Sequence, residues 1–103
     1  MRKSKIMWTE KSNNAILKDI GLRMKEYRIR QRMQQKELAE SAGVSLDTIA
    51  RLEQGKNISF EKLLRILRVL DMLENLEEFI PEPPISPILM KKLQGKKIER
   101  VRN

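Results

Sequence analysis

The stretch that decides the fold covers residues 35–55 and reads QKELAESAGVSLDTIARLEQG. Its first part predicts a short helix over residues 34–42, with Leu38 and Ala39 on the inner face. Gly43 follows at the point where the backbone needs a left-handed conformation to leave that helix. The chain therefore turns sharply in the middle of the stretch.

The second part of the stretch predicts another short helix with its own start and stop signals. Ser45 can accept from the free N–H groups of the first turn, and Asp47 suits the positive end of the helix dipole. Ile49 and Leu52 point inward, and Gly55 ends the helix. Two short helices joined in this way meet at a steep angle, so the start of the second helix can reach base edges in duplex DNA.

Three more helices are predicted around this pair. Between residues 14 and 31, apolar side chains three or four positions apart form one stripe, which consists of Ile16, Ile20, Met24 and Tyr27. The next helix begins at the cap Ser59 and buries Leu63, Ile66, Leu67 and Leu70. Asp71 and Glu74 have capping-box spacing and open a short acidic helix that contains Leu73, Leu76 and Phe79.

The predicted fold class is therefore all-α, with five helices around one core. We expect a basic N-terminal arm over residues 1–14 and the five-helix domain over residues 15–80. A Pro-rich linker and a basic tail follow over residues 81–103, because closely spaced prolines exclude regular helix; these are Pro81, Pro83, Pro84 and Pro87.

Composition excludes several classes of function. The 103 residues suffice for one domain, and they include no Cys and no His, so zinc ribbons, thiolate nucleophiles and imidazole catalysis are excluded. We expect no enzymatic activity, no metal and no cofactor. Apolar runs are too short for a membrane span, and the N-terminal segment lacks the pattern of a secretory signal, so we expect a cytoplasmic, nucleoid-associated protein.

Charge points to a nucleic-acid partner. The chain has 22 basic and 14 acidic side chains, a formal net charge of +8, which is the electrostatic pattern of a protein that binds DNA. Residues 1–32 carry ten basic and three acidic side chains, and residues 83–103 carry six and one, whereas the middle of the chain is slightly acidic. Ribosomal, membrane-surface and acidic-protein binders share such a composition.

Several spaced motifs between about residues 20 and 79 carry a family resemblance. They are Gln35, Glu37, Leu38 and Ala39 of the first short helix, Gly43, Val44 and Ser45 of the turn, and Thr48, Ile49, Glu53 and Gly55 of the second helix, with Arg28 upstream. This arrangement resembles the lambda-repressor-like, Cro/CI-type helix-turn-helix regulators, also called the XRE family. The resemblance implies a sequence-specific transcriptional regulator that binds double-stranded DNA, usually as a dimeric repressor at an inverted repeat.

The resemblance also implies roles for individual residues. Arg28 and Glu53 would form a structural ion pair that ties the first helix to the end of the recognition helix. The base-reading positions would be Ser45, Leu46, Asp47 and Arg51. The phosphate-binding positions would be Gln35, Thr48, Lys56 and Asn57, which position the protein without reading sequence.

Each of these roles has an ordinary structural alternative. The alternative for Arg28 and Glu53 is two solvated helix charges, but we favour the ion pair because both residues match motif positions. Asp47 suits a first helical turn without any partner, Leu46 could simply pack, and Arg51 could contact phosphate. Two residues also depart from the family pattern: Gln34 replaces a Thr, Ser or Asn cap, and Arg32 stands where Gly commonly ends the first helix.

The ends of the domain offer further partners. Two apolar surfaces are candidates for a homodimer contact: the fifth helix with Leu73, Leu76, Phe79 and Ile80, and the cluster of Ile6, Met7 and Trp8. Packing of these side chains in the core of a monomer would explain either cluster about equally well. After the Glu-Pro-Pro linker at residues 82–84, the Ser-Pro-x-Leu segment at residues 86–89 and the Leu-Gln-Gly-Lys-Lys ending at residues 93–97 are similar to tails of small regulators encoded beside HipA-like kinase toxins. This resemblance implies the alternative function, an antitoxin that binds such a kinase and autoregulates its operon.

Overall fold

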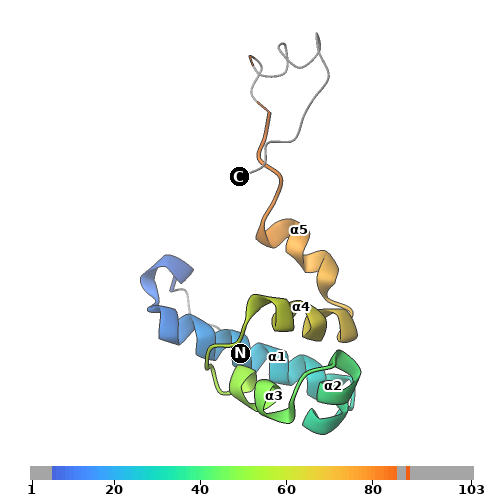
Figure 1. Ribbon diagram of the computed structural model, residues 1–103. Helices are drawn as coiled ribbons and strands as arrows, with labels where there is room; N and C mark the ends of the chain where they lie inside the picture. Colours follow the sequence, from blue (N-terminus) through green and yellow to red (C-terminus); the bar gives the residue numbers. More distant parts are fainter. Residues whose placement is uncertain (1–5, 86–87, 89–103) are drawn as a thin grey trace.

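The computed structural model describes residues 6–85 and residue 88, and this part of the chain is entirely helical and irregular, with no strand. The predicted all-α, five-helix architecture is confirmed (Figure 1). The elements are η1 (Trp8–Glu10), α1 (Asn13–Arg30), α2 (Gln35–Ala42), α3 (Leu46–Glu53), α4 (Phe60–Val69), η2 (Leu73–Asn75) and α5 (Leu76–Phe79), where η marks a 3₁₀ turn. None of the described helices is long and apolar enough to cross a membrane.

Helix α1 begins where Ser12 accepts a hydrogen bond from the Ala15 backbone N–H at 3.1 Å. Its inner face buries Gly21, Met24 and Arg28. The prediction that Tyr27 lies on this inner face is wrong, because its side chain is 45% exposed. Arg28 is buried one position later, since a partner inside the domain compensates its charge.

The turn between α1 and α2 forms although Arg32 and Gln34 depart from the family pattern that the sequence resembles. Arg32 adopts a left-handed conformation with φ of 59°, which a glycine would adopt without strain. At the start of α2, the Gln34 backbone N–H donates to the Glu37 carboxylate at 2.7 Å. Glu37 therefore supplies one half of a capping box although Gln34 is not a preferred cap.

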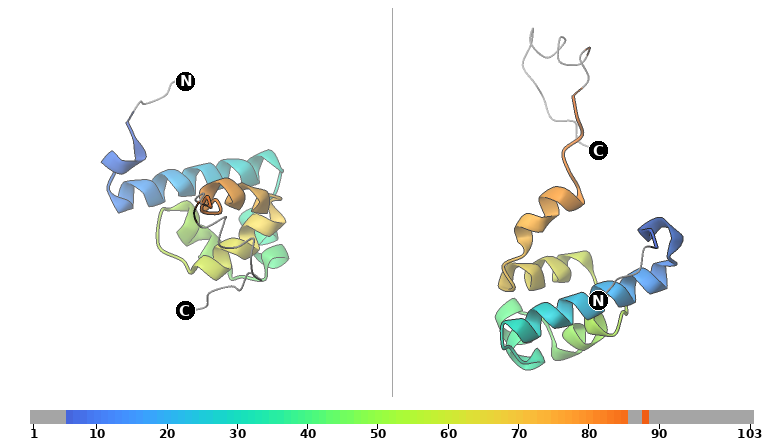
Figure 2. Two further views of the ribbon diagram at one scale, coloured as in Figure 1. Left: turned by 90° about the horizontal axis from the view of Figure 1, so that it is seen from above. Right: turned by 180° about the vertical axis from the view of Figure 1, so that it is seen from behind.

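The turn between α2 and α3 follows the sequence signals closely. Gly43 has φ of 71° and ends α2 in the left-handed region. Ser45 Oγ then accepts from the Thr48 backbone N–H at 3.1 Å, which caps α3. Helix α3 packs on both α1 and α2, and Figure 2 shows these helices from two further directions.

One hydrophobic core lies between α1, α2, α3 and α4. Its most deeply buried large side chains are Leu38, Ile49, Ile66 and Leu70, and the cluster also includes Met24, Ala39, Ala42, Leu52 and Leu67. Helix α4 begins at the predicted cap, where Ser59 Oγ accepts from the Lys62 backbone N–H at 3.1 Å. It packs against α2 and covers the core.

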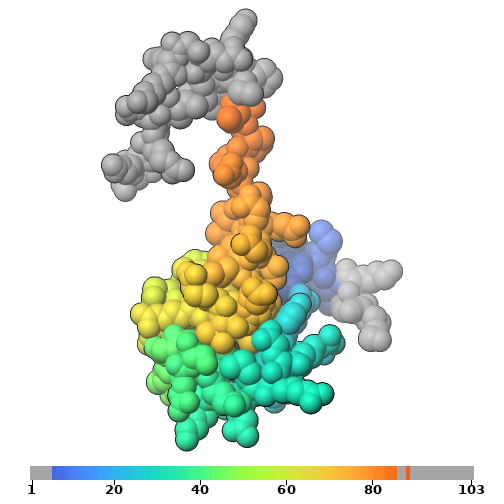
Figure 3. Space-filling view, turned by 90° about the vertical axis from the view of Figure 1, so that its right-hand side faces the viewer, coloured from blue at the N-terminus to red at the C-terminus, as the bar shows by residue number. Residues whose placement is uncertain are grey.

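The end of the domain differs from its prediction at one residue. Asp71 does not cap the fifth helix: it has φ of 62°, its backbone N–H donates to the Arg68 carbonyl, and Met72 precedes η2. A left-handed residue ends α4, so the chain must restart with η2 before α5 forms. Figure 3 shows the segment from α5 to residue 85 standing out from the body of the domain. The tail on which the antitoxin alternative depends lies outside the described residues, apart from Ile88.

Candidate nucleic-acid interface

A buried ion pair fixes the end of α3 against α1. Arg28 Nε donates to Glu53 Oε2 at 2.6 Å and Arg28 Nη2 donates to Glu53 Oε1 at 3.0 Å. The two side chains are only 9% and 4% exposed. The ion pair that the resemblance implies is thus present, in the bidentate geometry that a guanidinium offers to a carboxylate.

Two further hydrogen bonds complete this ion-pair site. Arg28 Nη1 donates to the Met33 carbonyl at 2.7 Å, and Gln35 Nε2 donates to Glu53 Oε1 at 2.9 Å. The end of α1, the following turn, the start of α2 and the end of α3 therefore meet at this ion pair. Because the buried charges are paired and hydrogen-bonded, they hold the relative orientation of α2 and α3.

Two glycines allow α1 and α3 to approach closely. A Cβ atom added at Gly21 would lie 2.3 Å from the Leu52 carbonyl oxygen. One added at Gly55 would lie 2.6 Å from Cγ of Lys18, and Gly55 also has φ of 80°. Neither position accepts a side chain without a shift of the backbone, so the seating of α3 depends on both.

The opposite face of α3 is bare. Thr48, Ile49, Leu52 and Glu53 are buried, whereas Ser45, Leu46, Asp47 and Gln54 are exposed and Ala50 and Arg51 are partly exposed. Leu46 is 51% exposed, so the packing alternative for Leu46 is not what the structure shows. All four residues predicted to read bases thus lie at the surface, although the Ser45 hydroxyl already caps the helix.

Arg51 has an internal partner that its position in the sequence did not reveal. Its Nε and Nη2 atoms donate to the Asn57 carbonyl oxygen at 3.3 and 3.0 Å. The side chain is therefore directed along the surface toward the connection between α3 and α4. This contact uses two of its five N–H donors and leaves the others for an external partner.

A shallow hollow of about 290 Å³ lies between the start of α3 and the start of α4. Its lining includes Ser45, Asp47, Thr48, Arg51, Asn57, Ile58, Ser59 and Lys62. Sequence reasoning missed Lys62, an exposed cation three residues after the cap of α4. A Lys in the first turn of a helix is unfavourable, because it lies near the positive end of the helix dipole. This unfavourable position was the signal in the sequence that could have marked Lys62 as functional.

A comparison with known families identifies the domain. A family model described as "Helix-turn-helix" matches residues 24–74, which run from the middle of α1 to η2. The chain carries a helix-turn-helix domain of the lambda-repressor-like family. It is thus a DNA-binding transcription regulator, with α2 and α3 as the two helices of the motif. No curated protein matches the chain.

The residues predicted to hold phosphate occupy unequal positions in the helix-turn-helix domain. Lys56 and Asn57 are exposed directly after α3. The Gln35 side chain is half-buried and already donates to Glu53, so its backbone N–H at the start of α2 is the freer donor. Thr48 is 6% exposed and its hydroxyl lies 2.9 Å from Ser45 Oγ, and this burial argues against a phosphate contact.

Carboxylates in the helix-turn-helix domain do not gather into a metal site. Within the described residues, no group of three or more His, Cys, Asp or Glu side chains is placed to hold an ion. One carboxylate outside the interface is perturbed: a hydrogen bond from Lys11 holds the pKa of Asp19 below its ordinary value, and the charge of Arg23 adds to the effect.

Proposed function

We propose that this regulator is a repressor that binds an inverted repeat as a dimer, with α3 of each copy in the major groove. The observation that carries the proposal is the contrast between the two faces of α3. Its inner face is held by a buried bidentate ion pair, and its outer face is bare. A rigid helix with bare side chains is what direct reading of base edges requires.

Arg51 is the strongest candidate for a base contact. Its free donors match O6 and N7 of guanine, and the hydrogen bonds to the Asn57 carbonyl hold the guanidinium in place before DNA arrives. Leu46 would meet a thymine methyl group, and Asp47 would accept from the N4 amine of cytosine. Asp47 also suits the first turn of α3 without any base, so its contribution to specificity has to be measured.

Phosphates on either side of the groove would set the register of the domain. Asn57 and Lys62 line the hollow beside α3, and Lys56 is exposed directly after α3. The backbone N–H of Gln35 lies at the start of α2. These groups donate to phosphate oxygens without reading sequence. A dimer would then place two copies of α3 about 34 Å apart, one helical turn of B-DNA. Repression follows if such a site overlaps a promoter.

The test begins with selection of bound duplexes from a random DNA pool, which should return an inverted repeat. On the selected site, Arg51→Ala should weaken binding by about 1 to 3 kcal/mol, and it should weaken binding to unrelated DNA much less. The matched control is Arg68→Ala, because Arg68 is an exposed arginine in the last turn of α4.

Two results would contradict this assignment. Equal weakening on all sequences would make Arg51 a phosphate contact, and a pool that returns no common sequence would remove the proposal altogether. The repressor role is tested separately with a reporter gene behind the selected site. Expression should fall when the protein is present and recover with the Arg51→Ala variant.

A further inference from the structure

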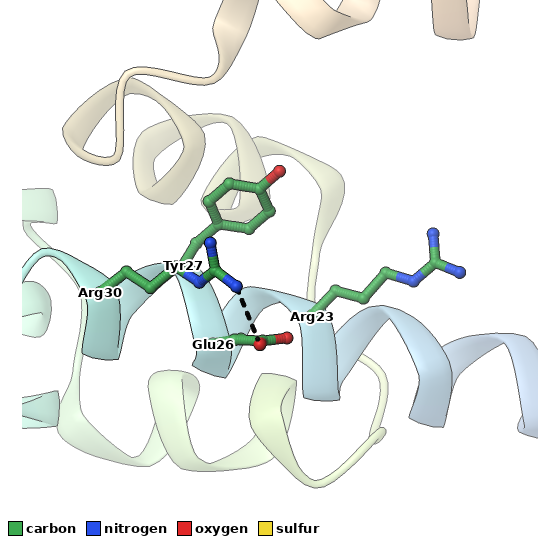
Figure 4. Close-up of a pocket in the computed structure, with 4 residues that line it drawn as sticks. All are labelled: Arg23, Glu26, Tyr27 and Arg30. Atoms are coloured by element: carbon green, nitrogen blue, oxygen red, sulfur yellow. Dashed lines mark hydrogen bonds and ion pairs between the residues drawn. The ribbon is translucent and has the colours of Figure 1, made fainter. Parts of the chain in front are cut away.

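A cationic groove lies on α1, outside the interface with DNA. It has a volume of about 350 Å³ and is lined by Arg23, Glu26, Tyr27 and Arg30, which Figure 4 shows as sticks. The side chains of Arg23 and Arg30 are 59% and 73% exposed, and the Tyr27 ring is 45% exposed. Glu26 pairs with Arg30 at 3.4 Å, and Arg23 pairs with Asp19 at 3.0 Å, outside the lining of the groove. The groove thus offers an aromatic surface between two arginines.

This groove faces away from the recognition helix. Gly21 marks the side of α1 that touches α3, since a Cβ atom there would meet the Leu52 carbonyl. Arg23 and Arg30 are two and nine residues further on, which at 100° per residue places both on the opposite side of α1. In Figure 4, Tyr27 likewise points away from the helices below α1. DNA held by α3 therefore does not account for the groove.

Helix α5 has the complementary chemistry. Residues 71–82 contain five carboxylates and no basic residue, in a chain with a net charge of +8. Phe79 and Ile80, at the end of α5, are each 65% exposed. Helix α5 packs mainly on η2 and stands out from the body of the domain (Figure 3). A surface that is both apolar and cationic would complement this exposed apolar pair and the carboxylates beside it.

We propose that the groove on α1 receives α5 of a second copy of this chain, and that the second copy's groove receives α5 of the first. Phe79 would lie on the Tyr27 ring, with Glu77 and Glu78 close to Arg23 and Arg30. Such a contact is self-complementary, as two-fold symmetry requires. The inference rests on the proposed dimer and names the surfaces that form it.

The ion pairs and the apolar contacts contribute differently to the proposed dimer. Exposed ion pairs add little free energy of association, so burial of Phe79 and Ile80 must supply most of the affinity. The charges instead select the partner, because an arginine pair beside this acidic helix favours α5 over other apolar segments. Reversal of the charges should therefore weaken pairing even though the apolar residues remain.

Sedimentation of the full chain, at about 0.15 M salt where surface charges are only partly screened, tests this contact. The wild type should be dimeric. The double variants Arg23→Glu/Arg30→Glu and Glu77→Arg/Glu78→Arg should each dissociate at least tenfold more readily, because like charges then meet in both contacts. An equimolar mixture of the two variants should dimerise again, since each groove then faces an α5 of opposite charge.

The control is the double variant Lys25→Glu/Arg68→Glu, which changes the net charge as much as the α1 variant does but leaves the groove intact. It should remain dimeric. A monomeric wild type, a dimeric Arg23→Glu/Arg30→Glu variant, or two monomeric variants that fail to pair when mixed would each overturn the proposal. Circular dichroism of each variant checks that the helices have formed.

A duplex with a single half-site separates this inference from the proposed function. The Arg23→Glu/Arg30→Glu variant should bind the half-site as well as the Lys25→Glu/Arg68→Glu control does, because the two have the same net charge and α3 is unchanged in both. If the wild type itself does not bind the half-site, the result counts against the proposal that α3 reads DNA, whatever the oligomeric state.

Discussion

At the scale of single residues, Glu53 holds the domain together. Its carboxylate receives two hydrogen bonds from Arg28 and one from Gln35, and the side chain is 4% exposed. A buried pair of this kind adds little over an apolar replacement of both partners, but removal of one partner leaves the other charge buried without compensation. The domain should therefore lose more stability when one partner of the pair is removed than when both are replaced by apolar residues.

We predict that Glu53→Ala lowers the free energy of unfolding by about 3 to 5 kcal/mol. Urea denaturation followed by circular dichroism measures the change. The control is Glu26→Ala, because Glu26 also pairs with an arginine but on an exposed surface, where the loss should stay below about 1 kcal/mol. Similar losses for the two variants would show that burial of the Glu53 pair has no special effect.

Arg32 is a residue whose identity conflicts with its backbone conformation. Its φ of 59° lies in the left-handed region, where a side chain costs roughly 1 to 2 kcal/mol. Arg32→Gly should relieve that strain and, after the higher chain entropy of glycine in the unfolded state, raise stability by about 0.5 to 1 kcal/mol. Arg30→Gly, inside α1, should lower stability by a similar amount. Thermal unfolding of both variants measures whether stability rises for Arg32→Gly and falls for Arg30→Gly. A loss of stability in Arg32→Gly would show that the Arg32 backbone is not strained.

At the scale of elements, the contact between α1 and α3 controls where the recognition helix lies. We predict that Gly21→Ala destabilises the domain by about 1 to 3 kcal/mol, because the new methyl group overlaps the Leu52 carbonyl. It should also weaken specific DNA binding, since α3 has to shift. The neighbouring Leu22→Ala is the control, because Leu22 is 64% exposed. Unchanged urea denaturation of Gly21→Ala would show that the helices have room to separate.

The N-terminal segment is attached to α1 by a small exposed cluster. Lys11 and Arg23 lie over the Trp8 ring at 4.4 and 5.0 Å, and both cations pair with Asp19, at 2.6 and 3.0 Å. The hydrogen bond from Lys11 is the main reason why the pKa of Asp19 is lowered. A lowered pKa means that the attachment is complete above the ordinary value of 3.8 and is lost as the pH falls through the lower, folded-state value.

Trp8 is the only tryptophan of the chain, so its fluorescence reports this attachment directly. We predict a fluorescence change below about pH 4 in the wild type, before any loss of helix by circular dichroism. Asp19→Asn should remove that transition, because the amide does not titrate. A transition of the same size in Asp19→Asn would assign the change to another group.

Most elements could be predicted from the sequence because their signals are local. The Ser45 and Ser59 caps, the left-handed Gly43 and the apolar spacing of α3 and α4 act within a few residues. The errors arise where a distant partner decides the outcome. Arg28 is buried because Glu53 receives it, so Tyr27 moves outward, and Asp71 ends α4 instead of opening the next helix.

The candidate site divides in the same way. Which residues lie on α3 follows from helical spacing, and the Arg28 and Glu53 pair followed from the family resemblance. The hydrogen bonds from Arg51 to Asn57 and the position of Lys62 beside the hollow depend on how α4 packs after a connection without regular structure. Sequence spacing does not specify that packing.

At the scale of the whole molecule, charge and specificity are separated. The first 32 residues are strongly basic, whereas residues 33–57, which include α2 and α3, are nearly balanced. Attraction to DNA should therefore come mostly from outside the recognition helix, and discrimination between sequences from α3. The carboxylates Glu77 and Glu78 lie on α5, which stands out from the body of the domain (Figure 3).

The central claim is that the outer face of α3 enters the major groove, and disulfide crosslinking tests it most directly. The chain has no cysteine, so Asp47→Cys introduces a single thiol on that face, and Leu22→Cys introduces one on the exposed surface of α1. Each variant is mixed with the selected duplex carrying a thiol tethered to a base in the major groove. We predict a crosslink from position 47 and none from position 22. A crosslink from position 22 with none from position 47 would contradict the account.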